Sequence, residues 1–93
     1  MPEILITRTA EKDLRRIGRG PERQRIIEGL QALAADADNL DIKAVVGATP
    51  WRRLRIGNYR VLYWLRPDHT YEIRRIVHRR DLDATAATLP ETE

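Results

Sequence analysis

A chain of 93 residues, of which 42% are hydrophobic and 33% charged, has the size and composition of one small globular domain. It contains no cysteine, which excludes disulfide bonds, thiolate metal sites and a thiol nucleophile. No apolar stretch approaches the length that spans a bilayer, and the first residues lack the pattern of a secretory signal. We therefore expect a single domain over residues 1–93, located in the cytoplasm, with no membrane partner, no cofactor and no metal.

The first half of the chain predicts one strand and two helices. The apolar run at 4–7 indicates a short strand, after which Thr7 or Thr9 can serve as a helix N-cap. The Gly-Arg-Gly-Pro sequence at 18–21 ends this helix and begins a second one, so we expect an antiparallel helical hairpin. The apolar stripe of the second helix comprises Ile26, Ile27, Leu30, Leu33 and Ala34.

The second half predicts three strands in succession. Residues 42–50 contain glycine and proline and are expected to form a connector. The strands are expected at Trp51–Ile56, Tyr59–Arg66 and Tyr71–His78, and they are separated by the turn sequences Gly-Asn and Pro-Asp-His. This pattern indicates two antiparallel hairpins that share the middle strand.

Together these elements predict an α+β fold. Its N-terminal strand is followed by a helical hairpin packed on one face of a largely antiparallel four-stranded sheet. The pattern also allows a short C-terminal helix over 83–87, and the acidic tail over 84–93 is expected to be flexible. The face of the sheet away from the helices is expected to be open.

Positive charge is concentrated in residues 51–80, which hold nine arginines and two acids, whereas residues 1–50 hold eight basic and eight acidic side chains. Side chains alternate across a strand, so Arg53, Arg55 and Arg60 are expected on the open face of the sheet. A sheet face rich in arginine suits a polyanion. Arginines at alternate strand positions are also common on solvated sheets, so a face without a function is the alternative.

The sequences WRRLRIGNYRVLY at 51–63 and IVHRRD at 76–81 resemble the signature of the RelE/ParE toxin superfamily of type II toxin–antitoxin systems. The WRxRxGxYR pattern resembles the RelE branch, which implies a ribosome-dependent mRNA endoribonuclease that inhibits translation. The ParE branch instead poisons DNA gyrase. Toxins of both branches are neutralised by an antitoxin. The resemblance therefore implies a cognate antitoxin in a hetero-oligomer, and the ribosome and mRNA as targets.

The resemblance also assigns roles to individual residues. Arg60 matches the catalytic arginine of the second strand, and Arg79 matches the arginine near the end of the last strand. Arg53 and Trp51 stand where the nuclease branch often has lysines. The tyrosine that follows the HRRD segment in the family is absent here.

RNA cleavage without a metal requires a base, cations that stabilise the phosphorane, and an acid. Arg60, Arg79 and Arg53 suit the second task, but arginine does not act as a base because it stays protonated. His78 titrates near neutrality and is the candidate for proton transfer, unless it sits at the strand end and faces away. The expected RNA-binding residues are Trp51, Arg52, Arg55 and Arg80.

Three functions stay open at this point. The protein is an RNase toxin, a ParE-like gyrase inhibitor, or an interaction module that has lost catalysis and presents its arginine face to an antitoxin. The missing lysine and tyrosine favour the second and third functions. The retained Arg60 and Arg79 favour the first, so the nuclease is the preferred prediction.

Overall fold

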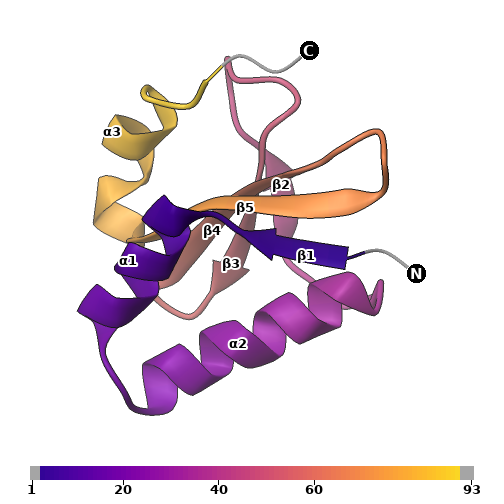
Figure 1. Ribbon diagram of the computed structural model, residues 1–93. Coiled ribbons are helices and arrows are strands. Elements are labelled where there is room, and N and C mark those ends of the chain that lie inside the picture. The colour runs from indigo at the N-terminus through magenta and orange to yellow at the C-terminus, as the bar shows by residue number, and fades with distance from the viewer. Residues whose placement is uncertain (1–2, 91–93) are drawn as a thin grey trace.

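The computed structural model describes residues 3–90, which fold into five strands, three α-helices and one 3₁₀ turn. The strands form one sheet in the order β1-β5-β4-β3-β2, with β1 parallel to β5 and the other neighbours antiparallel (Figure 1). No helix within these residues is long and apolar enough to cross a membrane. The elements are β1 (Glu3–Ile6), α1 (Arg8–Ile17), α2 (Pro21–Ala34), β2 (Ile42–Ala44), β3 (Arg52–Ile56), β4 (Tyr59–Leu65), β5 (Thr70–His78), η1 (Arg79–Asp81) and α3 (Leu82–Ala86).

The predicted α+β class is confirmed, but the expected number of strands was wrong. Residues 42–44, expected within a connector, form the edge strand β2 and pair antiparallel with β3. A strand of three residues is too short to display a period-two pattern of its own, so only its pairing with β3 identifies it. The sheet therefore has five strands and extends beyond β3 on the arginine-rich side.

The N-terminal elements follow their capping signals. Thr7, and not Thr9, is the N-cap of α1, because its Oγ1 accepts a hydrogen bond from the backbone N of Ala10 at 3.3 Å. The same hydroxyl donates to the carbonyl oxygen of Ile73 at 2.9 Å, which ties the start of α1 to β5. Gly18, with a φ of 84°, ends α1, and Pro21 begins α2.

The main core lies between the sheet and the first two helices, with α2 running across one side of the sheet in Figure 1. A methyl group at Gly29 would collide with the side chain of Ile56, so the missing side chain lets α2 approach β3 closely. Ile27 and Ala34 of the expected stripe are only partly buried. The buried residues of this core are Ala10, Leu14, Ile26, Leu30, Leu33, Leu54, Val61, Tyr63, Ile73 and Ile76.

A second, smaller core covers part of the opposite face, which was expected to be open. Leu62 lies on that face between Arg60 and Trp64, and it is fully buried because the 45–50 connection and α3 pack over it. Burial of this apolar side chain offsets the cost of ordering the cover. The cluster comprises Val45, Trp51 and Leu62, with Ala48, Trp64, Leu82, Ala86 and Leu89 packed around it.

The second core also contacts the C-terminal residues, which were expected to be flexible from residue 84. Thr85 is buried, and the indole Nε1 of Trp51 donates a hydrogen bond to the carbonyl oxygen of Pro90 at 2.9 Å. The chain is therefore attached to the sheet as far as Pro90. The remainder of the expected tail, residues 91–93, lies outside the described residues.

Candidate functional site

Four arginines gather on the sheet face that α3 leaves uncovered. Arg55 and Arg60 are direct cross-strand partners, a pairing of like charges that disfavours folding. The pKa of Arg60 is lowered, first by desolvation and then by the charges of Arg55, Arg53 and Arg79. We call these four residues the arginine cluster. A fold that tolerates this repulsion presents a surface suited to a polyanion.

Arg60 is the residue of the cluster that the backbone holds in place. Its Nη1 donates to the carbonyl oxygens of Gly57 at 3.1 Å and Tyr59 at 3.0 Å, at the β3–β4 turn. Gly57 permits this turn by adopting a φ of 58°. A guanidinium has five N–H donors, and the Nε and Nη2 groups of Arg60 make no hydrogen bond to the described residues. These donors are therefore left for an anion.

Arg79 reaches the cluster through backbone contacts at the end of β5. Its backbone N donates to the carbonyl oxygen of Asn58 at 2.7 Å, which sets the 3₁₀ turn against the β3–β4 turn. His78 precedes this turn as its N-cap, and its Nδ1 accepts from the backbone N of Arg80 at 3.3 Å. The sequence-distant Arg60 and Arg79 are thus held near the same pair of turns.

One acid lies among the arginines, and the sequence pattern gave no sign of it. Asp41 is placed within 3.3 Å of Arg53 Nη1 and 3.9 Å of Arg55 Nη1, and its side chain remains 45% exposed. Its carbonyl oxygen also accepts from the backbone N of Arg55 at 2.9 Å. The carboxylate is therefore an internal counter-ion that bridges two guanidinium groups and reduces the repulsion between them.

Lys43 is a second residue that sequence reasoning missed. It is the direct partner of Arg53 in the β2–β3 pairing and is exposed on the same face. The sequence pattern placed it in a connector, where its direction is undefined, and only the pairing of β2 reveals it. A lysine thus stands beside the arginine cluster although the family's lysine positions are occupied by Arg53 and Trp51.

His78 does not join the cluster. It is the cross-strand partner of Tyr59, and the two rings meet edge to face with centroids 5.7 Å apart. Tyr59 faces the helices, whereas its neighbour Arg60 faces the other side of the sheet. The geometry therefore favours the alternative interpretation, in which this histidine faces away from the arginines.

The expected RNA-binding residues are divided between the two faces, and only Arg55 belongs to the cluster. Arg52 pairs with Tyr63 and lies on the helix-covered side of β3. Arg80 lines a separate hollow of about 480 Å³ that is bordered by α1 and β5. Trp51 is only 2% exposed, so the structure corrects the interpretation of this ring as a platform for a base.

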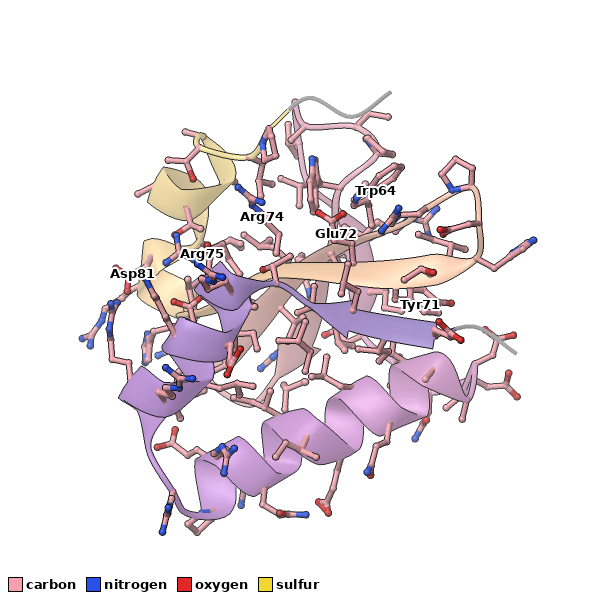
Figure 2. The ribbon with its side chains drawn as sticks, viewed as in Figure 1. Trp64, Tyr71, Glu72, Arg74, Arg75 and Asp81 are labelled. Carbon is pink, nitrogen blue, oxygen red and sulfur yellow. The ribbon has the colours of Figure 1, made fainter. Side chains whose placement is uncertain are left out.

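A groove of about 930 Å³ adjoins the arginine cluster. It runs between the 45–50 connection and α3, above the second core. Lys43 and Arg53 line it together with apolar side chains, so the groove and the cluster share Arg53. Trp64 lies beside Glu72 of β5 (Figure 2). Its ring centroid is 6.2 Å from that of Trp51.

A family model described as the ParE toxin of the type II toxin–antitoxin system parDE matches residues 4–83. The chain belongs to the RelE/ParE superfamily of type II toxins. A comparison with curated protein sequences finds no match. The family assignment agrees with the resemblance of the segments at 51–63 and 76–81.

Solved structures agree with the family and the fold. The toxin resembles a chain of the RelB–RelE antitoxin–toxin complex from Methanococcus jannaschii, with 30% identity and a TM-score of 0.71 over 87% of this chain and 96% of that one. It also resembles a chain of the RelBE2 complex from Mycobacterium tuberculosis, with 26% identity and a TM-score of 0.54 over 85% and 100%. A chain of the RelE–RelB complex from Pyrococcus horikoshii has 21% identity and a TM-score of 0.67 over 84% and 94%, a likeness of fold.

In this toxin, the two residues that match the superfamily's catalytic arginines lie in one place. Arg60 is fixed at the β3–β4 turn, and Arg79 is fixed against the same turn by its backbone. Arg53, at a lysine position of the family, lies on the same face. The matched positions therefore form one cationic surface, and His78 lies outside it, against Tyr59.

Proposed function

We propose that this toxin is a ribosome-dependent mRNA endoribonuclease that inhibits translation in the cytoplasm and uses neither a metal nor a cofactor. The observation that carries the proposal is the convergence of Arg53, Arg55 and Arg79 on the backbone-anchored Arg60. Repulsion among these guanidinium groups destabilises the fold, and a bound anion would relieve it.

The arrangement suits the charge that develops when an RNA phosphate is attacked by its own 2′-hydroxyl. Two carbonyl oxygens hold the guanidinium of Arg60 in place, so its remaining donors can stabilise a phosphorane with little further ordering. Arg53 and Arg55 are held by Asp41 in the same region, where their planar forks match phosphate oxygens. The scissile phosphate is therefore assigned to the space among these guanidinium groups.

Proton transfer requires groups that can change charge, which arginine does not. Two such side chains border the cluster. Asp41 contacts Arg53 and Arg55 directly, and Lys43 stands across from Arg53. We assign the proton steps to this pair, since His78 faces the helices.

A cognate antitoxin is the expected partner of the idle toxin. Chains similar to this one are found in complexes of toxin with antitoxin. A cationic surface with a strained pair of arginines gains stability from an acidic cover. We therefore propose a hetero-oligomer in which acidic side chains of the antitoxin neutralise the arginine cluster.

A gyrase inhibitor is the second candidate, and the name of the matching family model, a ParE toxin, favours it. The test is inducible expression followed by sequencing of new RNA 5′ ends and, in parallel, mapping of gyrase-linked DNA breaks. The nuclease predicts new 5′ ends at a fixed position within codons of translated mRNA and no DNA breaks. DNA breaks without new RNA ends would contradict the nuclease proposal and support the gyrase inhibitor.

A further inference from the structure

We propose that the groove between the 45–50 connection and α3 is a nucleobase subsite, which holds the base of a nucleotide next to the phosphate on the arginine cluster. The inference rests on the proposed nuclease function. It adds a second site, on the part of the sheet face that the small core covers.

Continuity with the cluster is the first argument. Arg53 lines the groove and also belongs to the arginine cluster, and Lys43 lies beside it. A single-stranded RNA whose phosphate is bound by Arg53 and Arg55 must place a neighbouring nucleoside within reach of the same side chains. The groove is the adjoining hollow in that direction, with a volume of about 930 Å³.

The lining of the groove is the second argument. Its apolar walls come from Val45 and Ala48 on one side and Ala86 and Leu89 on the other, over the buried ring of Trp51. Polar and charged side chains make up much of the remaining lining. Proteins that read single-stranded RNA hold a splayed-out base between apolar or aromatic surfaces and contact its edge with polar groups. A sugar or a phosphate alone is polar and would not pack against such apolar walls.

One charged residue of the groove gives a base preference. Asp83 lines the groove on the α3 side, opposite the basic residues. A carboxylate repels phosphate but accepts hydrogen bonds from the exocyclic amino groups of adenine, cytosine and guanine. Uracil has no such amino group. The subsite is therefore expected to hold adenosine, cytidine or guanosine in preference to uridine.

The chain offers a matched pair of variants for the test. Ala87, the C-cap of α3, is exposed and lines the groove, whereas Ala84 is exposed on the same helix and lines the hollow beside α1. Ala87→Trp places an indole in the groove and obstructs part of it, whereas Ala84→Trp places the same ring in the hollow beside α1. The probe is a fluorescent RNA trinucleotide with 2′-deoxyribose at the cleaved position, measured by anisotropy.

We expect Ala87→Trp to raise the Kd of this probe about tenfold or more and Ala84→Trp to leave it unchanged, because burial of a base against apolar walls contributes on this scale. Probes with one abasic site on either side of the scissile phosphate separate the base from the backbone. One of the two abasic probes should bind wild-type toxin as weakly as the intact probe binds Ala87→Trp. The affinity of that abasic probe should not fall further when Ala87→Trp replaces the wild-type toxin.

Each outcome decides a different claim. Equal binding of the intact and both abasic probes to wild-type toxin overturns the subsite, and this result does not depend on how any variant folds. Loss of antitoxin capture by Ala87→Trp with unchanged RNA binding also overturns it, because the groove would then dock protein. If the Kd is the same for intact and abasic probes and is also unchanged by Arg60→Ala, the result counts against the proposed function itself.

Discussion

The side chain of Arg60 is anchored by the carbonyl oxygens of Gly57 and Tyr59. Arg55 lies directly across from it, so the anchoring works against electrostatic repulsion. A side chain held in this way loses little entropy when a phosphate arrives, which is what a preorganised donor requires. At the scale of single residues, Arg60 is therefore the centre of the site.

Replacing Arg60 with alanine should abolish activity and spare the fold. Loss of a preorganised donor lowers the cleavage rate by a factor on the order of a hundred to a thousand. Relief of repulsion from Arg55 offsets the lost hydrogen bonds, so the free energy of unfolding should change by about 1 kcal/mol or less. The measurements are single-turnover cleavage and thermal melting. Arg52→Ala, an arginine on the other face of β3, is the control and should cleave normally.

Replacing His78 with alanine should have a small effect on cleavage. The ring packs on Tyr59 and caps the turn at Arg79, so its loss removes a cap that contributes about 0.5–2 kcal/mol to stability. Cleavage should stay within about tenfold of wild type, whereas loss of a general acid or base costs about a hundredfold or more. A loss of cleavage rate as large as that of Arg60→Ala would show that His78 takes part in proton transfer.

At the scale of secondary-structure elements, α1 completes the edge of β5 beyond the end of β1. The carboxylate of Asp13, 5% exposed, accepts from Arg75 Nε at 2.8 Å, from Arg75 Nη2 at 3.3 Å and from the backbone N of Ile76 at 2.8 Å. Figure 2 shows Arg75 beside α1, where Asp13 accepts its hydrogen bonds. One acid therefore satisfies donors that would otherwise be unpaired where β1 has ended.

Asp13→Ala should lower the free energy of unfolding by about 2–3 kcal/mol, because it leaves a buried N–H and a guanidinium without their acceptor. Glu11→Ala on the same helix is the matched control. It breaks the exposed pair with Arg15 and should cost about 0.5 kcal/mol or less. Chemical denaturation of the three proteins checks the difference. Equal stability of the two variants would mean that Asp13 does not support the edge of β5.

Elements with a clear periodic pattern were predictable from the sequence, and so was the position of Arg60. Strands β3 and β4 show alternation, and the glycines and proline at 18–21 mark the boundary of the two helices. The strand β2 was not predictable, because three residues carry no period. Asp41 and Lys43 depend on that strand for their positions, so the sequence did not reveal their approach to the arginines.

Burial of Trp51 was missed for a related reason. Its cover comes from the 45–50 connection and from α3, and neither segment has a pattern that shows where it packs. His78 was assigned from its chemistry alone, while its direction depended on the register between β4 and β5. The register between β4 and β5 shifts at Leu62/Tyr63. Side chains of β5 therefore do not alternate regularly along the whole strand, and the sequence pattern did not show which face each one occupies.

At the scale of the whole molecule, the arginine cluster and Lys43 occupy one part of one sheet face. Their neighbour on that face is the small core under α3, and α1 and α2 pack on the opposite side of the sheet (Figure 1). Binding of RNA should therefore be driven by the release of counterions from a few phosphates.

The affinity for single-stranded RNA should fall steeply as salt is raised. Each neutralised phosphate contributes about 0.7 to the slope of log K against log salt, so four arginines give a slope of about 3. Anisotropy titrations at several salt concentrations measure this slope. Removal of Arg55, an exposed member of the cluster, should lower the slope by about 0.7, and Arg52→Ala should leave it unchanged. A flat titration would point to an apolar protein partner.

The most direct test of the account uses purified toxin and ribosomes stalled with a defined codon in the A site. We expect wild-type toxin to cut the mRNA within that codon, in the presence of a metal chelator at a concentration that leaves the ribosomes intact. Arg60→Ala should cut at least about a hundredfold more slowly, and Arg52→Ala at the wild-type rate. Intact mRNA with folded wild-type toxin, or equal cutting by Arg60→Ala, would contradict the claim that the arginine cluster is the catalytic centre of a ribosome-dependent nuclease.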